Sequence, residues 1–148
     1  MSAKPCVELL DLDLAEGVRI ADEMLSIDPR RPFSSTDFAS QGKIKVLIIQ
    51  ETNPAKRTSS YVGFCTLNQG TSFVELARLY VIPDARRRGI GEAAVLQVFH
   101  YLAPFGLTAV GIDVREPDAL RFWESATDSL DLDVTGGGFS SRWTIYAP

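Results

Sequence analysis

A chain of 148 residues with 45% hydrophobic and 23% charged side chains has the length and composition of one soluble globular domain, so we expect a single domain over residues 1–148. Fifteen basic and nineteen acidic residues leave a net charge of −4, which argues against a nucleic-acid partner, because nucleic-acid affinity depends on a net basic face. His100 is the only histidine, and Cys6 and Cys65 are the only cysteines, so we expect no metal site built from several histidines or paired cysteines.

The first part of the chain predicts a strand followed by two helices. Val7 to Leu10 is the predicted strand, and the helix after it is expected to be capped by Asp13, with Glu16 three residues later as in a capping box. Apolar residues recur at helical spacing along this helix, and Asp28-Pro29 ends it. A further short helix is expected over residues 35–41.

Three strands are predicted next, over Lys43 to Gln50, Tyr61 to Leu67 and Phe73 to Ile82. The loops between them are rich in turn-forming residues. Successive strands joined in this way indicate an antiparallel meander.

The second half of the chain alternates helices and strands. A helix is predicted from Gly89 to Leu102, because apolar residues recur on its faces at helical spacing. Thr108 to Val114 is the next strand, and it should run parallel to the strand before the helix, joined by a right-handed crossover. A helix from Pro117 to Ala126 follows. The chain is expected to close as a hairpin of two strands, Leu130 to Val134 and Phe139 to Tyr146.

Residues 83–92, Pro-Asp-Ala-Arg-Arg-Arg-Gly-Ile-Gly-Glu, stand between a strand and a helix and combine three features of an anion site. Gly89 and Gly91 allow close approach of the backbone and positive φ, so that successive N–H groups can converge on one group. The first turn of the helix leaves N–H groups unpaired and carries partial positive charge. Arg86 to Arg88 add donors suited to phosphate oxygens. The alternative is a solvated loop, but three such features at one strand-to-helix junction favour an anion site.

Two nucleotide-binding motifs have to be compared with this turn, and neither accounts for it. Gly89 to Ala94 matches G-x-G-x-x-A, the fingerprint of dinucleotide folds, and Asp113 follows at about the right distance. In those folds the first glycine follows the strand almost at once, whereas residues 83–88 intervene here, and too little chain remains after Asp113 for a second half. There is no Gly-Lys-Ser/Thr sequence, so the turn is not a nucleotide-hydrolysing phosphate loop.

At these residues the chain resembles the GNAT family, the acetyl-CoA-dependent N-acetyltransferases, whose signature is Arg/Gln-x-x-Gly-x-Gly/Ala at the start of a helix. Arg86 to Gly91 fits this signature in full, and Glu75 to Pro83 resembles the strand that leads into it. The expected order of elements also resembles this family over nearly the whole chain. The resemblance implies an α/β fold with a central mixed sheet of about seven strands, mostly antiparallel with a parallel, splayed central pair, flanked by about four helices.

The resemblance also implies how acetyl-CoA is bound. The main-chain amides that would bind the CoA pyrophosphate are those of Arg87, Arg88, Gly89, Ile90, Gly91 and Glu92. The Arg86 side chain would contact the same group, and backbone groups near Leu79 and Val81 would pair with pantetheine like an added strand. Trp123 either lines the thioester end of the tunnel or fills the core.

A second family region is normally an Asn, then Ala-x-x-Phe/Leu-Tyr, then Gly-Phe. This chain has Glu116, Ala119, Phe122 and Trp123 at the corresponding positions, with Thr127-Asp128 where Gly-Phe would fall. The usual tyrosine acid is therefore absent at that position.

Acetylation of an alkyl amine, whose pKa is about 10, requires that the amine lose a proton. Glu75 is the candidate base, acting through a water, and it matches a frequent glutamate of the family. Steps of two along the strand place the Glu75 side chain on one face with Leu79 and Val81. Arg78 is placed on the opposite face, where we expect it to pair across the sheet. The alternative is that Glu75 is an exposed carboxylate or a member of an ion pair.

The leaving thiol has a pKa of about 8.5, so it can depart as a thiolate with modest help. Tyr80 and Tyr61 are the candidates to replace the missing acid, and each is otherwise a packed strand aromatic. A strand N–H near Leu79 or Val81 would polarise the acetyl carbonyl. His100, late on an apolar helix, is expected to be structural.

We therefore expect an acyl-CoA-dependent N-acetyltransferase that moves an acetyl group from acetyl-CoA to a primary amine by direct attack, without a metal. A small-molecule acceptor is favoured over protein N-termini or lysines, because nothing resembles an added peptide-docking module. One alternative is a noncatalytic acyl-CoA-binding regulatory module, which the altered second region motivates. Another is a small phosphate-binding interaction protein.

The chain shows no long apolar segment. Residues 1–6 lack the apolar core of a signal peptide, so we expect a cytoplasmic location. The longest aliphatic run, Val46 to Ile49, is too short to span a bilayer, so no membrane partner is expected. The resemblance also implies that the chain can pair as a homodimer, as many family members do.

Overall fold

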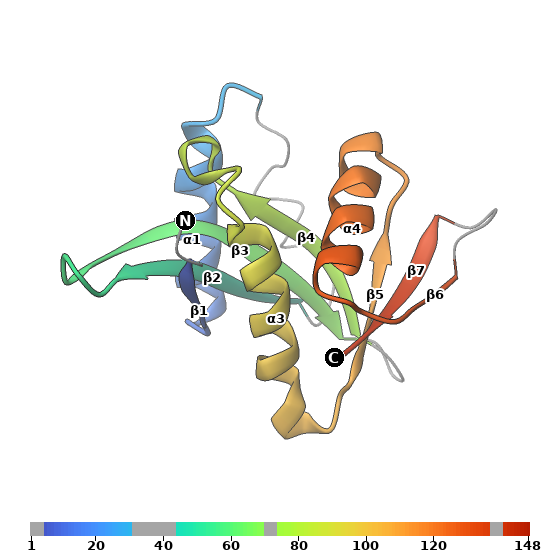
Figure 1. The fold of residues 1–148 in the computed structure, drawn as a ribbon. Helices are drawn as coiled ribbons and strands as arrows, with labels where there is room; N and C mark the ends of the chain where they lie inside the picture. Colours follow the sequence, from blue (N-terminus) through green and yellow to red (C-terminus); the bar gives the residue numbers. More distant parts are fainter. Residues whose placement is uncertain (1–4, 31–43, 70–73, 137–140) are drawn as a thin grey trace.

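The computed structural model describes residues 5–30, 44–69, 74–136 and 141–148, in which seven strands form one mixed sheet with α-helices on both faces (Figure 1). The strands are β1 Cys6–Leu10, β2 Ile44–Asn53, β3 Thr58–Gln69, β4 Val74–Val81, β5 Ala109–Asp113, β6 Val134–Gly136 and β7 Arg142–Tyr146. The α-helices are α1 Leu14–Ser26, α3 Ile90–Leu102 and α4 Pro117–Ser129, and the 3-10 turns are η1 Pro83–Ala85 and η2 Ala103–Phe105. The strand order is β1-β2-β3-β4-β5-β7-β6.

Among the described strands, only the central pair of this sheet is parallel. β1 to β4 form the expected antiparallel meander, and β5, β7 and β6 form a second antiparallel set. β4 and β5 pair in parallel with Glu75 opposite Gly111, and the two strands then diverge towards their carboxyl ends (Figure 1). This arrangement confirms the predicted mixed sheet with a parallel, splayed central pair.

The two faces of the sheet are covered by different helices. α1 lies on one face, and α3 and α4 lie on the other (Figure 1). Val46 and Ile48 of β2 pack with Ile20 and Leu25 of α1, whereas Leu47, between them, packs into the core under α3 and α4. This alternation is the consequence of the two-residue period of a strand that is buried on both sides.

The helix α1 begins as the sequence predicts. The Asp13 side chain accepts a hydrogen bond of 2.9 Å from the amide of Glu16, which confirms Asp13 as the N-cap. The Glu16 carboxylate does not reach back to the cap, because it binds Arg19 one turn later, with the Nε atom at 3.1 Å. The expected capping box is therefore present only in its first half.

Two predictions near the C-terminus differ from the structure. α4 continues to Ser129, and the chain then turns through Asp131, which has a φ of +53°. Leu132 is buried in the core, so the strand begins only at Val134, where it pairs with Ile145. The strand predicted from Leu130 is therefore wrong for its first four residues.

The described ranges contain three α-helices where about four were expected. The short helix predicted over residues 35–41 lies outside the described residues. None of the described helices is long and apolar enough to cross a membrane.

Candidate functional site

The turn that joins β4 to α3 has a backbone shaped to bind an anion. Gly89 is the N-cap of α3 and has left-handed backbone angles, with a φ of +78°, and Ile90 after it begins the right-handed helix. A left-handed residue followed by a right-handed one turns successive N–H groups to one side of the chain. Arg87 is also left-handed, with a φ of +63°, a conformation that costs energy for any residue other than glycine.

The first turn of α3 offers main-chain donors. Ala93 donates to the Gly89 carbonyl at 3.0 Å, and this is where the backbone hydrogen bonds of the helix begin. Within the described residues, the amides of Ile90, Gly91 and Glu92 have no backbone acceptor. These amides, together with the positive end of the helix dipole, can donate to a phosphate-like group.

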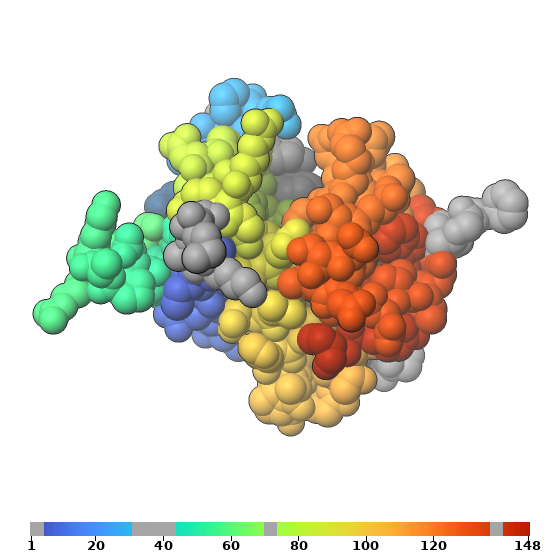
Figure 2. All heavy atoms as spheres, viewed as in Figure 1, coloured from blue at the N-terminus to red at the C-terminus, as the bar shows by residue number. Residues whose placement is uncertain are grey.

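The start of α3 also packs tightly against α4. A Cβ atom at Gly91 would lie 2.7 Å from Cε1 of Phe122, so no larger residue fits there without movement. Phe122 in turn meets Trp123 edge to face, with ring centroids 5.0 Å apart. Trp123 is buried in the core under α3 and α4, and its lining of a ligand tunnel stays a prediction. In the space-filling view, the turn lies at the surface (Figure 2).

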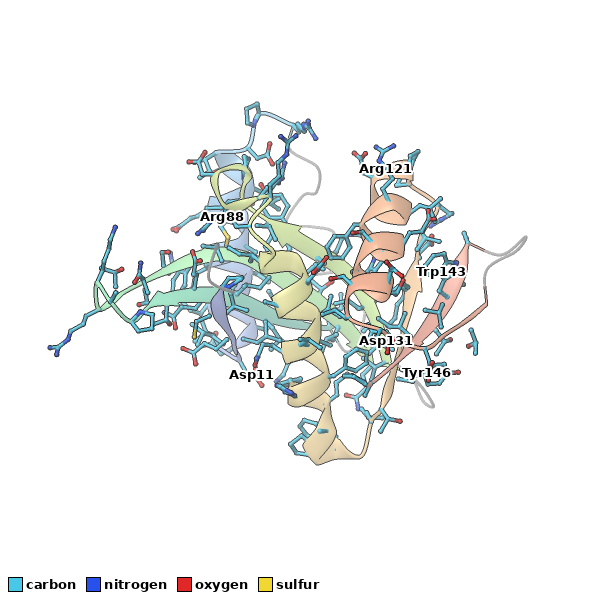
Figure 3. The ribbon with its side chains drawn as sticks, viewed as in Figure 1. Asp11, Arg88, Arg121, Asp131, Trp143 and Tyr146 are labelled. Carbon is cyan, nitrogen blue, oxygen red and sulfur yellow. The ribbon has the colours of Figure 1, made fainter. Side chains whose placement is uncertain are left out.

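The three arginines of the turn do not act as one cluster. Arg87 is exposed. Arg88, which lies beside the start of α3 (Figure 3), makes a two-pronged ion pair with Glu51, at 2.6 and 3.1 Å. Arg86 turns inward instead, and its Nε atom donates to the Val81 carbonyl at 2.8 Å.

Asp28 and Tyr80 form a buried polar pair that joins α1 to β4. The two residues are 2% and 4% exposed, and the Tyr80 hydroxyl donates to Asp28 Oδ2 at 2.6 Å. The Arg86 guanidinium lies 3.3 Å from the same oxygen, and the Arg30 amide donates to Oδ1 at 2.9 Å. The sequence predicts only the end of a helix at Asp28, and no pattern in the sequence pairs position 28 with position 80.

These contacts determine how the two groups ionise. The hydrogen bond from Tyr80, the amide of Arg30 and the charge of Arg86 together lower the pKa of the Asp28 carboxyl. Burial raises the pKa of the Tyr80 hydroxyl, and the hydrogen bond to the Asp28 carboxylate raises it further. Tyr80 is therefore protonated at neutral pH, and its proton is directed at Asp28. For Tyr80 to act as the predicted acid, its hydroxyl would have to break the hydrogen bond to Asp28 and donate to the leaving thiolate instead.

A bulge in β4 changes which residues share a face. Thr66 of β3 pairs with Arg78 and Leu67 pairs with Leu76, so Ala77 is an extra residue in β4. An extra residue shifts the two-residue alternation by one, and side chains before and after the bulge follow opposite parity.

The Glu75 side chain therefore lies on the same face of the sheet as α1. Glu75 lies between Val74 and Leu76, which both pack under α3 and α4, so its side chain points to the other face. After the bulge, Leu79 and Val81 pack on the α3 side. The prediction that Glu75 shares a face with Leu79 and Val81 is wrong, because strict alternation cannot account for the bulge.

The face predicted for Arg78 is wrong for the same reason, and its pairing across the sheet stays a prediction. Arg78 is paired with Thr66, beyond the bulge, and is two residues before Tyr80, which packs under α1. Residues two apart in a strand share a face, so Arg78 lies on the α1 face, as Glu75 does. Glu75 is half-buried and is paired with Gly111 of β5, at the point from which β4 and β5 diverge. Glu75, the candidate base, therefore lies on the α1 face of the sheet, at the position where β4 and β5 begin to separate.

The remaining candidates are His100, Tyr61 and the side chain of Glu92. His100 is exposed near the end of α3, and Tyr61 is 44% exposed on β3. The Glu92 side chain accepts a hydrogen bond of 3.1 Å from Ser129, at the end of α4. Neither His100 nor Tyr61 belongs to the group formed by Asp28, Tyr80 and the turn.

The family model for acetyltransferases of the GNAT family matches residues 21–126, a range that contains β4, the turn and α3. The chain therefore belongs to the acetyltransferase (GNAT) family. No curated protein matched the sequence.

Solved structures with the same fold come from several organisms. The ribosomal-protein-S18-alanine N-acetyltransferase from Escherichia coli has a TM-score of 0.63 and 20% identity, covering 95% of this chain and 90% of that one. The PaiA N-acetyltransferase from Thermoplasma acidophilum, in complex with coenzyme A, has a TM-score of 0.58 and 16% identity, covering 97% and 99%. A spermidine N-acetyltransferase chimera from Vibrio cholerae and hSSAT has a TM-score of 0.61 and 11% identity, covering 95% of each chain. At these identities the likeness establishes the fold.

Proposed function

We propose that this protein is an acyl-CoA-dependent N-acetyltransferase that moves an acetyl group from acetyl-CoA to a primary amine by direct attack. The observation that carries this proposal is the turn before α3, where left-handed Gly89 leads into helix amides that have no backbone acceptor among the described residues. That turn lies at the carboxyl end of a strand that diverges from its parallel neighbour. The similar fold of an N-acetyltransferase in complex with coenzyme A supports the choice of ligand.

The turn fits the pyrophosphate of coenzyme A. The amides of Ile90, Gly91 and Glu92 would donate to its oxygens, and the exposed Arg87 side chain would add positive charge. A hydrogen bond to a charged group contributes about 1.5–3 kcal/mol, and the helix dipole adds about 0.3–1 kcal/mol. Together these interactions are sufficient to select a diphosphate over a neutral group.

The open edge of β4 fits the amide-bearing arm of the same ligand. Ile82 donates to Val62 of β3 at 2.9 Å, so by strand alternation the backbone groups of Leu79 and Val81 point away from β3, towards β5. The Val81 carbonyl already accepts from Arg86, which leaves its N–H and the groups of Leu79 to pair with pantetheine.

Acetyl-CoA supplies an acetyl group that is activated as a thioester. The protein has to remove a proton from the amine, and Glu75 is the residue that we propose as the acceptor of that proton, through a water. Because Glu75 lies on the α1 face of the sheet, the amine is expected to approach from the face opposite to α3 and α4. The leaving thiol, with a pKa of about 8.5, does not require the Tyr80 proton.

The experiment that tests this function measures thiol release from acetyl-CoA with a panel of polyamines, amino acids and peptides with free N-termini. Both small and protein acceptors belong in the panel, because the similar folds include a spermidine and a ribosomal-protein acetyltransferase. Turnover on one of these amines supports the enzyme, and we favour a small molecule. Tight binding of CoA without turnover on any amine would favour the noncatalytic acyl-CoA-binding module.

A titration followed by amide NMR shifts distinguishes a coenzyme A site from the site of a small phosphate-binding interaction protein. CoA is expected to move the resonances of Arg87 to Glu92 at concentrations where inorganic phosphate does not. Equal affinity for simple phosphates and for CoA would favour the phosphate-binding interaction protein instead.

A further inference from the structure

We propose that Asp28 and Arg86 are positioning residues for the turn before α3. Asp28, just beyond the end of α1, holds the Arg86 guanidinium beneath the turn, so that main-chain amides and not the Arg86 side chain bind the pyrophosphate. This inference rests on the proposed function, because it concerns the same coenzyme A site. It replaces the role that the signature alone assigns to Arg86.

Two of the five N–H donors of the Arg86 side chain are already directed to the protein. Its Nε atom donates to the Val81 carbonyl at 2.8 Å, and one terminal nitrogen donates to Asp28 Oδ2 at 3.3 Å. The guanidinium also lies over the Tyr80 ring, with its central carbon 5.5 Å from the ring centroid. To turn its whole guanidinium towards a phosphate beyond the turn, Arg86 would have to leave a buried carboxylate, a carbonyl and an aromatic ring.

Asp28 is a fixed anchor for this side chain. The Arg30 amide donates to one carboxylate oxygen and the Tyr80 hydroxyl to the other, so both oxygens are oriented without Arg86. The side chain is 1% exposed, and a buried carboxylate is stable only with a cation or several donors beside it. Because Tyr80 belongs to β4, the anchor ties the end of α1 to the central strand as well as to the turn.

The bond from Arg86 to Val81 fixes the chain immediately before the anion site. Between these residues, Ala85 donates to Ile82 at 3.0 Å and Arg86 donates to Pro83 at 3.2 Å, so the segment is held internally by η1. Arg87 follows directly and has a φ of +63°. A left-handed arginine persists only where its neighbours are held in place, and the Arg86 side chain provides that restraint.

Charge and geometry predict opposite effects for the loss of Asp28. If only charge mattered, removal of a carboxylate near a diphosphate site would tighten CoA binding. If Asp28 positions the turn through Arg86, its removal weakens CoA binding although the site becomes more positive. The sign of the change in affinity therefore separates the two explanations.

The first test compares Asp28→Asn with wild type by calorimetric titration of CoA and by steady-state kinetics. We expect Kd for CoA and KM for acetyl-CoA to rise by about tenfold or more, the effect of a lost charged hydrogen bond, while kcat stays within about twofold. Glu23→Gln removes an exposed carboxylate from α1 and should change neither constant. An unchanged or lower Kd for Asp28→Asn overturns the inference, whereas a wild-type protein that does not bind CoA overturns the proposed function.

The second test uses Arg86→Met and stays decisive if Asp28→Asn does not fold. A direct contact to the phosphates would make CoA binding less salt-dependent in Arg86→Met, whereas a positioning role weakens binding and leaves the salt dependence unchanged. Arg86→Lys keeps the charge but cannot span Val81 and Asp28 with one planar group, so it should resemble Arg86→Met. A flatter salt dependence in Arg86→Met, or wild-type affinity in Arg86→Lys, overturns the inference.

Discussion

Gly91 lies directly against the ring of Phe122, so that a Cβ atom at position 91 would be 2.7 Å from Cε1 and 3.1 Å from Cζ. The glycine is the last residue of the Arg-x-x-Gly-x-Gly signature, and the phenylalanine belongs to α4. Gly89, the first glycine of the signature, has a different role, because it supplies the left-handed backbone of the N-cap. The two glycines of one motif are therefore required for different physical reasons.

The contact with Phe122 predicts that Gly91→Ala destabilises the protein. The added methyl would force the Phe122 ring to move, and Phe122 is itself packed against Trp123. Overpacking of this kind costs about 1–3 kcal/mol, which urea unfolding can measure. Phe122→Leu in the same chain should recover part of the loss. If Gly91→Ala is as stable as wild type, the close packing of α3 on α4 is not as described.

The backbone at Gly89 predicts a loss of CoA binding in Gly89→Ala. Gly106, after η2 at the other end of α3, is the matched control, since its φ of +74° is similar to the +78° of Gly89 and nothing lies within 4 Å of its Cβ position. Both alanine variants should lose about 1–2 kcal/mol of stability to left-handed strain. Only Gly89→Ala should weaken CoA binding in a titration. Equal CoA affinities in the two variants would contradict the role of the turn.

The sequence predicts the strand–turn–helix unit well, because its signals are local. Gly89, the helical spacing after it and the β-branched residues before it each act within a few residues. The side-chain direction of Glu75 depends instead on the bulge at Ala77, which is visible only in the pairing of β4 with β3. Periodicity counted along β4 alone therefore assigned Glu75 and Arg78 to opposite faces, although they share one.

The buried group around Asp28 was missed for a related reason. Asp28 and Tyr80 are separated by 52 positions in the chain, and their contact exists only after α1 has packed on the sheet. An aspartate before a proline at the end of a helix is ordinary turn chemistry, so the local pattern offers a sufficient explanation without a partner. Tyr80 and Arg86 were named as candidates for other roles, and the structure shows that both contact the same carboxylate.

The lowered pKa of Asp28 predicts an acid-sensitive contribution to stability. Because the folded-state pKa lies below the unfolded value of about 3.9, Asp28 stabilises the folded state above that pH and loses this contribution as the pH falls through its folded pKa. The difference in unfolding free energy between wild type and Asp28→Asn should therefore be largest near neutral pH and shrink below about pH 4. Urea unfolding across this range measures it. A difference that does not change with pH would contradict the hydrogen-bonded carboxylate described here.

The position of Glu75 predicts a defect in catalysis without a defect in CoA binding. Glutamine has the same size as glutamate but cannot take up a proton from the amine, so Glu75→Gln should lower kcat by about 10²–10⁴-fold while Kd for CoA is unchanged. Glu8→Gln, an exposed carboxylate on β1, is the matched control and should retain wild-type turnover. Part of the activity should return as the pH approaches the amine pKa of about 10, because the deprotonated amine then needs no base. If Glu75→Gln keeps the wild-type kcat at neutral pH, Glu75 is only a strand carboxylate. If its kcat stays low even at high pH, the role of Glu75 is not the removal of the amine proton.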